Sequence, residues 1–200
     1  RGPKGSVGLY LVDAKCPEVA VTAMSPLDLT RPQARVEFDG APARPLAGTD
    51  SESVAERALA TGAILWSADA VGGAQRCLDM AVEYAKLRVQ FGRPIGGFQA
   101  VKHMCADMLL EVESARSTAY WAATTLDDAA GNPVAAAALA KAYCGAAYAK
   151  VAAAAIQIHG GIGFTWEHPV QMYYKRAKTS ELLFGDPAWQ RERLAAQVGL

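Results

Sequence analysis

Two segments of the sequence bring together residue types that suit a phosphorylated, ring-containing ligand. The first, "KLRVQFGRPIGGFQAVKH" (residues 86–103), places Arg88 three positions before Phe91. A guanidinium offers a rigid fork of donors to phosphate oxygens, and an aromatic face can stack on a ring. The competing interpretation is structural, because Lys86 and Arg88 also complement the negative end of a helix dipole before a glycine and a proline that end the helix. Spacing alone favours the structural interpretation.

The second segment, "QIHGGIGFTWEHP" (residues 157–169), has three glycines within four positions. A glycine pair after a helix is commonly a C-cap, and G-G-x-G without a preceding strand is not the dinucleotide-binding fingerprint. Three glycines exceed what a cap requires, and they let main chain approach a cofactor closely. The pattern alone supports a cap and a ligand-contacting loop equally.

Other kinds of chemistry lack their signatures. The three histidines have no H-E-x-x-H or clustered Cys/His spacing, so we predict no metal site. No G-x-S-x-G elbow supports serine hydrolase chemistry. The cysteines are never spaced as C-x-x-C, which predicts buried free thiols in a reducing compartment. There are four of them: Cys16, Cys77, Cys105 and Cys144.

Composition narrows the classes of partner. Lys and Arg number 20 and Asp and Glu number 20, so the formal net charge is zero. Without a basic stripe, we expect neither nucleic acid nor an anionic membrane as a partner. No apolar run is long enough to span a membrane and no signal peptide is recognisable, so we predict a cytoplasmic protein. Because the chain begins at Arg1 and is strand-like from about residue 7, we expect it to be a piece of a longer polypeptide.

Two regions must position these residues, and residues 1–47 form the first. They are rich in proline, glycine and β-branched residues, and apolar runs between turn signals predict short strands. Three short strands bury little apolar surface alone, so we expect them to complete or pack against another part of the protein. The predicted strands lie within residues 8–14, 18–24 and 33–40.

Residues 48–200 form the second region, where helix formers dominate. We predict a mainly α fold: an antiparallel four-helix bundle, a short β segment before it and a short helix after it. Ser53 and Glu56 suggest a capping box at the first helix, and Asp186 followed by proline suggests the cap of the last. The four bundle helices are expected at about residues 53–88, 99–130, 133–158 and 170–184.

The two motifs, in this order on a helical bundle after a β segment, resemble the acyl-CoA dehydrogenase family. The resemblance rests on "R-x-Q-F-G-x-P-I" (88–95) and "Q-I-H-G-G-x-G" (157–163), and it covers essentially the whole chain. Residues 1–47 resemble the end of the family's middle β-domain, and residues 48–200 resemble its C-terminal helical domain.

The resemblance implies that FAD is bound between subunits, with this helical domain covering a neighbour's cofactor. Arg88, Gln90 and Phe91 would contact the pyrophosphate and adenosine part of FAD. The glycine loop would line the same part of the cofactor. Donors from arginine and main chain suit a diphosphate. The implied FAD-binding residues are Arg88, Gln90, Phe91, Gln99, Gln157, Gly160 and Gly161.

The same resemblance places the family's catalytic glutamate, within an E-G-T segment after R-x-A-K, at Phe184. In the family this glutamate removes the α-proton while hydride leaves the β-carbon. Phenylalanine cannot accept a proton, so we predict no catalytic residue in this chain. The threonine of E-G-T is replaced by Asp186, which suits a helix cap better than a place beside phosphate. A second family position for the base falls at about Gly62.

Three hypotheses follow. The leading one is a subunit for α,β-dehydrogenation of acyl-CoA thioesters within a tetramer, hetero-oligomeric rather than homo-oligomeric. A partner protomer would carry the glutamate, and electron-transfer flavoprotein would accept the electrons. The second is a homo-oligomeric dehydrogenase with its base elsewhere, for which Glu181 and Asp69 are the candidates in this chain. The third is a flavin-free helical scaffold on the same fold.

Overall fold

The computed structural model describes residues 8–46, 50–128 and 130–200. The chain divides into two compact units, Arg1–Leu59 and Ala60–Leu200. Helix α1 (Ser51–Leu87) begins in the first unit and forms part of the second. Most of the described chain is helical, which confirms the predicted mainly α fold class.

Four short strands form two antiparallel ladders in the first unit. Strand β2 (Val19–Ala23) pairs with β3 (Ala34–Phe38), and β1 (Tyr10–Val12) pairs with β4 (Ala43–Pro45). We predicted the first three strands and missed β4, whose three residues include a proline and give no alternating apolar pattern. Every residue of β3 is exposed within this unit.

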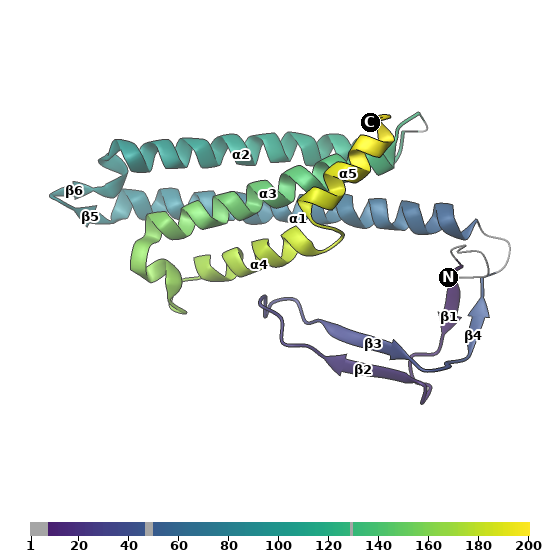
Figure 1. The fold of residues 1–200 in the computed structure, drawn as a ribbon. Coiled ribbons are helices and arrows are strands. Elements are labelled where there is room, and N and C mark those ends of the chain that lie inside the picture. The colour runs from purple at the N-terminus through teal and green to yellow at the C-terminus, as the bar shows by residue number, and fades with distance from the viewer. Residues whose placement is uncertain (1–7, 47–49, 129) are drawn as a thin grey trace. The chain divides into compact units, whose positions relative to one another are not determined.

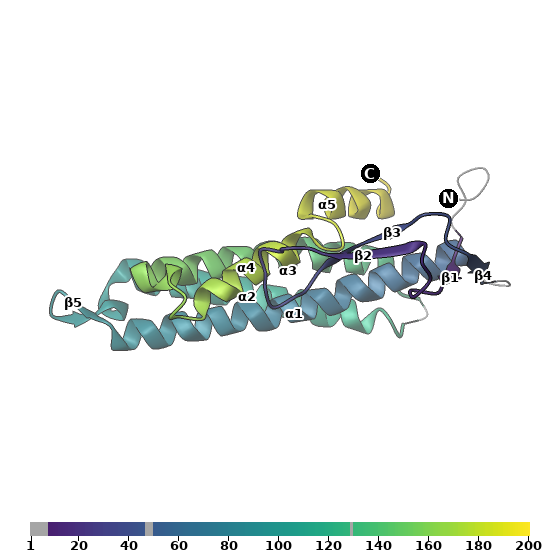
Figure 2. The ribbon, with the colours of Figure 1, turned by 90° about the horizontal axis from the view of Figure 1, so that it is seen from below.

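The second unit is an antiparallel helical bundle, shown in Figures 1 and 2. Helix α3 packs against α2, α4 and α5. These four are α2 (Gln99–Thr124), α3 (Pro133–His159), α4 (Val170–Leu182) and α5 (Pro187–Gln197). None of the helices within the described ranges is long and apolar enough to cross a membrane.

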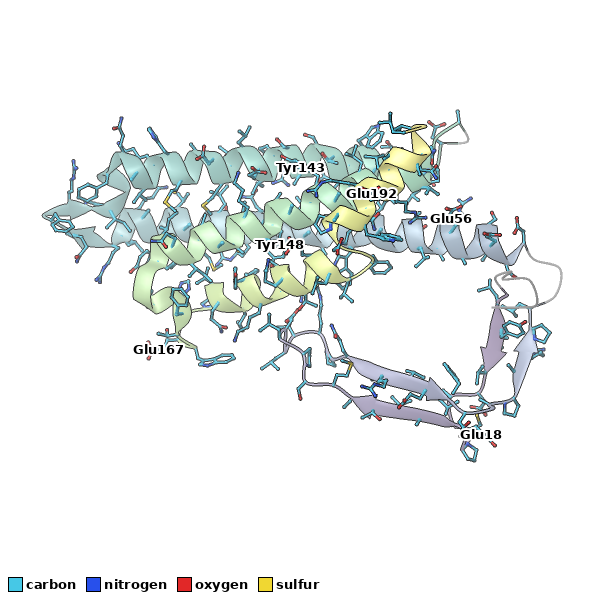
Figure 3. All side chains as sticks on the ribbon, in the orientation of Figure 1. Glu18, Glu56, Tyr143, Tyr148, Glu167 and Glu192 are labelled. Carbon is cyan, nitrogen blue, oxygen red and sulfur yellow. The ribbon has the colours of Figure 1, made fainter. Side chains whose placement is uncertain are left out.

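Alanine-rich α3 is buried on almost all sides, as its lack of a polar face predicts. Tyr148 on this helix is fully buried within the bundle (Figure 3) and packs in one cluster with side chains from α1, α2 and α4. Burial raises the pKa of the Cys77 and Cys144 thiols to about 12, so both stay protonated. The prediction of buried free thiols is confirmed for these two, whereas Cys16 and Cys105 are free but only half-buried.

The start of α1 differs from the expected capping box. Asp50 precedes the helix, and its Oδ1 accepts a hydrogen bond from the Ser53 amide at 3.3 Å. Ser53 is therefore inside the first turn, and the prediction of a Ser53–Glu56 box was wrong. Asp50, three residues earlier, caps the helix instead, because aspartate is as good an N-cap residue as serine.

The predicted cap of the last helix is confirmed. Asp186 Oδ1 accepts from the Trp189 amide at 2.8 Å, and Pro187 takes the first helical position. Helix α3 begins in the same way, since the Asn132 side chain accepts from the Ala135 amide at 3.0 Å.

Two helices end earlier than predicted. Helix α2 ends at Thr124 instead of at about residue 130. At this end the hydroxyls of Thr124 and Thr125 donate to the carbonyls of Trp121 and Ala122. Such local bonds compete with continued helix. Helix α4 ends at Leu182, because Leu183 is extended with ψ of 143°, and Phe184 after it adopts a left-handed backbone with φ of 61°.

Candidate functional site

Both sequence motifs lie at one end of the bundle (Figures 1 and 2). This end contains the last turn of α1, the first turn of α2 and the end of α3. Short connections add the hairpin of β5 (Val89–Gln90) and β6 (Arg93–Pro94), and the 3-10 turn η3 (Gly160–Phe164). Glu167, which Figure 3 labels, follows η3 in the connection to α4.

The hairpin after α1 fixes the direction of the first motif. Phe91 and Gly92 both have positive φ, 52° and 75°, as a two-residue type I′ turn requires. The Ile95 amide donates to the Arg88 carbonyl at 2.8 Å and closes the hairpin. The Phe91 side chain is 92% exposed at the tip, where it meets Phe98 edge to face at 6.1 Å between ring centroids. The hairpin therefore presents an aromatic ring outward.

A buried ring stack joins the two motifs. Tyr84, one turn before Arg88, stacks on His159, with ring centroids 4.6 Å apart and planes 24° apart. His159 immediately precedes Gly160. The centroid of the His168 ring, in the connection between η3 and α4, lies 4.4 Å from that of the His159 ring. The stack holds the arginine turn of α1 against the glycine turn η3.

His159 is a neutral ring in this position. Burial lowers its pKa below the ordinary value of 6.5; its bond to the Ala155 carbonyl opposes this, and the nearby His168 lowers the pKa further. Its Nδ1 lies 2.7 Å from the Ala155 carbonyl, which can only accept, so Nδ1 carries the proton. The His159 ring therefore contributes to the loop by packing between Tyr84 and His168.

Two of the three glycines of η3 leave open space, whereas a Cβ atom on buried Gly163 would lie 3.0 Å from the Ile156 carbonyl oxygen. Gly160 has φ of 62°, which side-chain-bearing residues rarely adopt. A Cβ atom built on Gly160 or Gly161 would meet no atom within 4 Å. Packing within this chain therefore does not require glycine at Gly161, whereas the close approach of a bulky ligand would.

The polar groups of this end are available to a ligand. The Arg88 guanidinium makes no ion pair or hydrogen bond with the residues that the structure describes. Among the described residues, the Gln90 side chain bonds to the neighbouring Val89 carbonyl alone, at 2.9 Å, and Gln99 is the first residue of α2. All seven predicted FAD-binding residues are exposed. An unpaired cation, free amides and an open glycine turn suit a diphosphate, so the residues present fit FAD. No group of His, Cys, Asp or Glu within the described ranges could hold a metal ion.

Phe184 and Gly62 lie against each other in a different part of the bundle, between α1 and the end of α4. A Cβ atom built on Gly62 would lie 2.6 Å from Phe184 Cε1. The ring centroid of Trp66, one turn along α1, is 5.7 Å from that of Phe184. The two positions that the family resemblance indicates for a base therefore share one volume, and an aromatic ring fills it.

The two alternative bases are held by cations. Glu181 Oε2 lies 2.6 Å from Lys178 Nζ, and Asp69 Oδ1 lies 2.9 Å from Arg176 Nη2. Both carboxylates are therefore engaged in ion pairs within this chain.

Sequence reasoning missed Lys141 and Gln190, which shape the connection between α4 and α5. Each is 1% exposed. Lys141 Nζ donates to the carbonyls of Glu181 and Gly185 at 3.2 Å each, and Gln190 Nε2 donates to the carbonyl of Phe184. The one available signal was a lysine at position 141 within the largely apolar, alanine-rich start of α3.

Comparisons with known proteins agree with this fold and these motifs. The family described as "Acyl-CoA dehydrogenase, C-terminal domain" matches residues 53–199. The chain therefore belongs to the acyl-CoA dehydrogenase family.

Individual relatives point the same way. The chain is 48% identical over 138 residues to acyl-CoA dehydrogenase IpdE2 of Mycolicibacterium smegmatis, covering 69% of this chain and 42% of that protein. It is 42% identical over 193 residues to acyl-CoA dehydrogenase FadE34 of Mycobacterium tuberculosis, covering 95% and 26%. The solved structure titled "Tcur3481-Tcur3483 steroid ACAD G363A variant" superposes with a TM-score of 0.87 at 29% identity, over 96% of this chain and 52% of that one. The chain thus spans about half or less of the length of these relatives.

Proposed function

We propose that this chain is part of an FAD-dependent acyl-CoA dehydrogenase and that it completes the FAD site of a partner protomer that carries the catalytic glutamate. One contrast carries the proposal. The end of the bundle with Arg88 and Gly161 offers unpaired donors and open space, whereas Phe184 stands where the family resemblance would put the base. A chain that acted alone would need both halves.

Each residue at the exposed end has a role that its chemistry suits. Arg88 would bind the diphosphate through its fork of donors, and Gly160 and Gly161 would admit the diphosphate beside main chain. Phe91 would stack on an aromatic part of the cofactor, while Gln90, Gln99 and Gln157 would offer amide donors and acceptors. When bound, FAD accepts the hydride that leaves the β-carbon of the thioester.

The names of relatives support the assembly that we propose. A structural neighbour is titled as a pair, Tcur3481-Tcur3483, and as a steroid ACAD. The relative CarC of Acetobacterium woodii, 36% identical over 133 residues, is named as a subunit of a caffeyl-CoA reductase-Etf complex. We extend both to this chain as a hetero-oligomer that acts on CoA thioesters and passes electrons to an electron-transfer flavoprotein.

The experiment is to purify the full-length protein alone and together with a family member, encoded beside it, that has the E-G-T glutamate. Flavin content and dehydrogenation of acyl-CoA thioesters are measured for both preparations. We expect bound flavin and turnover from the pair only. High turnover by the lone protein would show that a base exists elsewhere in it, and a pair without flavin would support a scaffold instead.

A further inference from the structure

The backbone at Phe184 is held in a conformation that phenylalanine rarely adopts. Its φ of 61° lies in the left-handed region, which costs a residue with a side chain about 1 kcal/mol or more. Such a conformation persists only where surrounding contacts over-determine it. The contacts around Phe184 come from three helices.

Main-chain contacts hold both sides of the residue. The carbonyl of Phe184 accepts from buried Gln190 on α5, and buried Lys141 on α3 donates to the carbonyls of Glu181 and Gly185. Gly185 also has positive φ, 91°, and a Cβ atom there would collide with the Trp189 ring. These contacts hold the turn in a conformation that aims the Phe184 ring at α1.

The receiving surface on α1 matches the ring. Built on Gly62, a Cβ atom would lie 2.6 Å from Cε1 and 2.8 Å from Cζ of Phe184, distances that real Cβ atoms do not show. Trp66 flanks the ring at 5.7 Å between centroids and 51° between planes. Of the twenty residue types, only glycine leaves the ring this position beside the helix.

We infer that Gly62 and Phe184 are a matched pair that closes this chain's own acyl site and excludes a CoA thioester from it. At Gly62, one position that the resemblance implies for a base, there is no side chain. The ring of Phe184, the other such position, occupies the space beside it. The location of the acyl site rests on the proposed function; the packing of the pair does not. Thioester then binds only beside the partner's glutamate.

A stability cycle tests the pairing. In the full-length protein, Gly62→Ala should lower Tm, because the ring must shift. In a Phe184→Gly background, the same change should raise Tm, since alanine favours helix and the ring is gone. Gly72→Ala is the matched control on α1, because a Cβ atom there meets nothing within 4 Å. Its effect should be equal in both backgrounds. A Gly62→Ala effect of the same sign and size in both backgrounds would overturn the pairing.

A binding count tests the exclusion. Octanoyl-CoA is titrated into the assembled protein, and the equivalents bound per protomer are compared between the wild type and Phe184→Gly. We expect more equivalents in the variant. Equal counts, at any value, would overturn the exclusion role. Flavin content of the same samples reports separately on the proposed function, because Phe184 is not among the residues that we assign to FAD.

Discussion

Single residues decide the shape of the α4–α5 connection, and Lys141 is the clearest case. Burial lowers the pKa of its amine, and the charges of Glu181 and Asp186 partly oppose this. The amine donates to the carbonyl of Glu181, in the last turn of α4, and to that of Gly185, just after the helix. Nothing in the sequence pattern predicted this, because the contact joins residues that are 40 and 44 positions apart.

Replacement of Lys141 by methionine keeps the stem and removes the donors. Two carbonyls then lose their partner, and we expect the free energy of unfolding to fall by about 1–3 kcal/mol. Lys150→Met is the control on the same helix. Its exposed ion pair with Glu111 contributes less than about 1 kcal/mol. Urea unfolding measures both, and an equal loss in the two variants would contradict the role given to Lys141.

Glu181 gives a kinetic prediction at the same scale. Its ion pair with Lys178 indicates a structural carboxylate. Removal of a general base lowers the rate by about 10² to 10⁴. We expect Glu181→Gln in the assembled enzyme to lower kcat by less than about tenfold. A loss of kcat by about 10² to 10⁴ would instead identify Glu181 as the general base.

At the scale of elements, the sequence predicted which helices exist better than where they end. The dominance of helix formers in residues 48–200 predicted the bundle helices. The ends of α2 and α4 depend on threonine hydroxyls and on a left-handed phenylalanine. The β5–β6 hairpin was read only as a helix stop, since Phe-Gly is not a usual type I′ turn sequence.

The stack of Tyr84 and His159 joins α1 to α3 and carries a pH prediction. The folded pKa of His159 lies below 6.5, so the unfolded chain binds a proton first as pH falls. Stability from this residue is therefore complete above about pH 7 and declines as pH falls through 6.5 toward the folded pKa.

His159→Gln keeps a donor for the Ala155 carbonyl without titrating. We expect the difference in unfolding free energy between wild type and variant to shrink as pH falls from about 7 to about 5. Denaturant unfolding at several pH values gives this difference. A constant or growing difference would contradict a lowered pKa at His159.

At the scale of the whole molecule, the chain combines an exposed, donor-rich end with a second place, where the Phe184 ring closes against Gly62. The motifs predicted which residues gather at that end, because the antiparallel bundle brings the end of α1, the start of α2 and the end of α3 together. They could not predict the closure. It depends on the fit between Gly62 and Phe184, which lie far apart in sequence and meet only in the folded chain.

The affinity of the assembled protein for FAD, with Arg88→Ala in this chain alone, tests the central claim most directly. A hydrogen bond to a charged group contributes about 1.5–3 kcal/mol, so Kd should rise by about 10- to 100-fold. Arg193→Ala on α5 is the control and should leave Kd unchanged. If Arg88→Ala also leaves Kd unchanged, this chain does not complete its partner's FAD site.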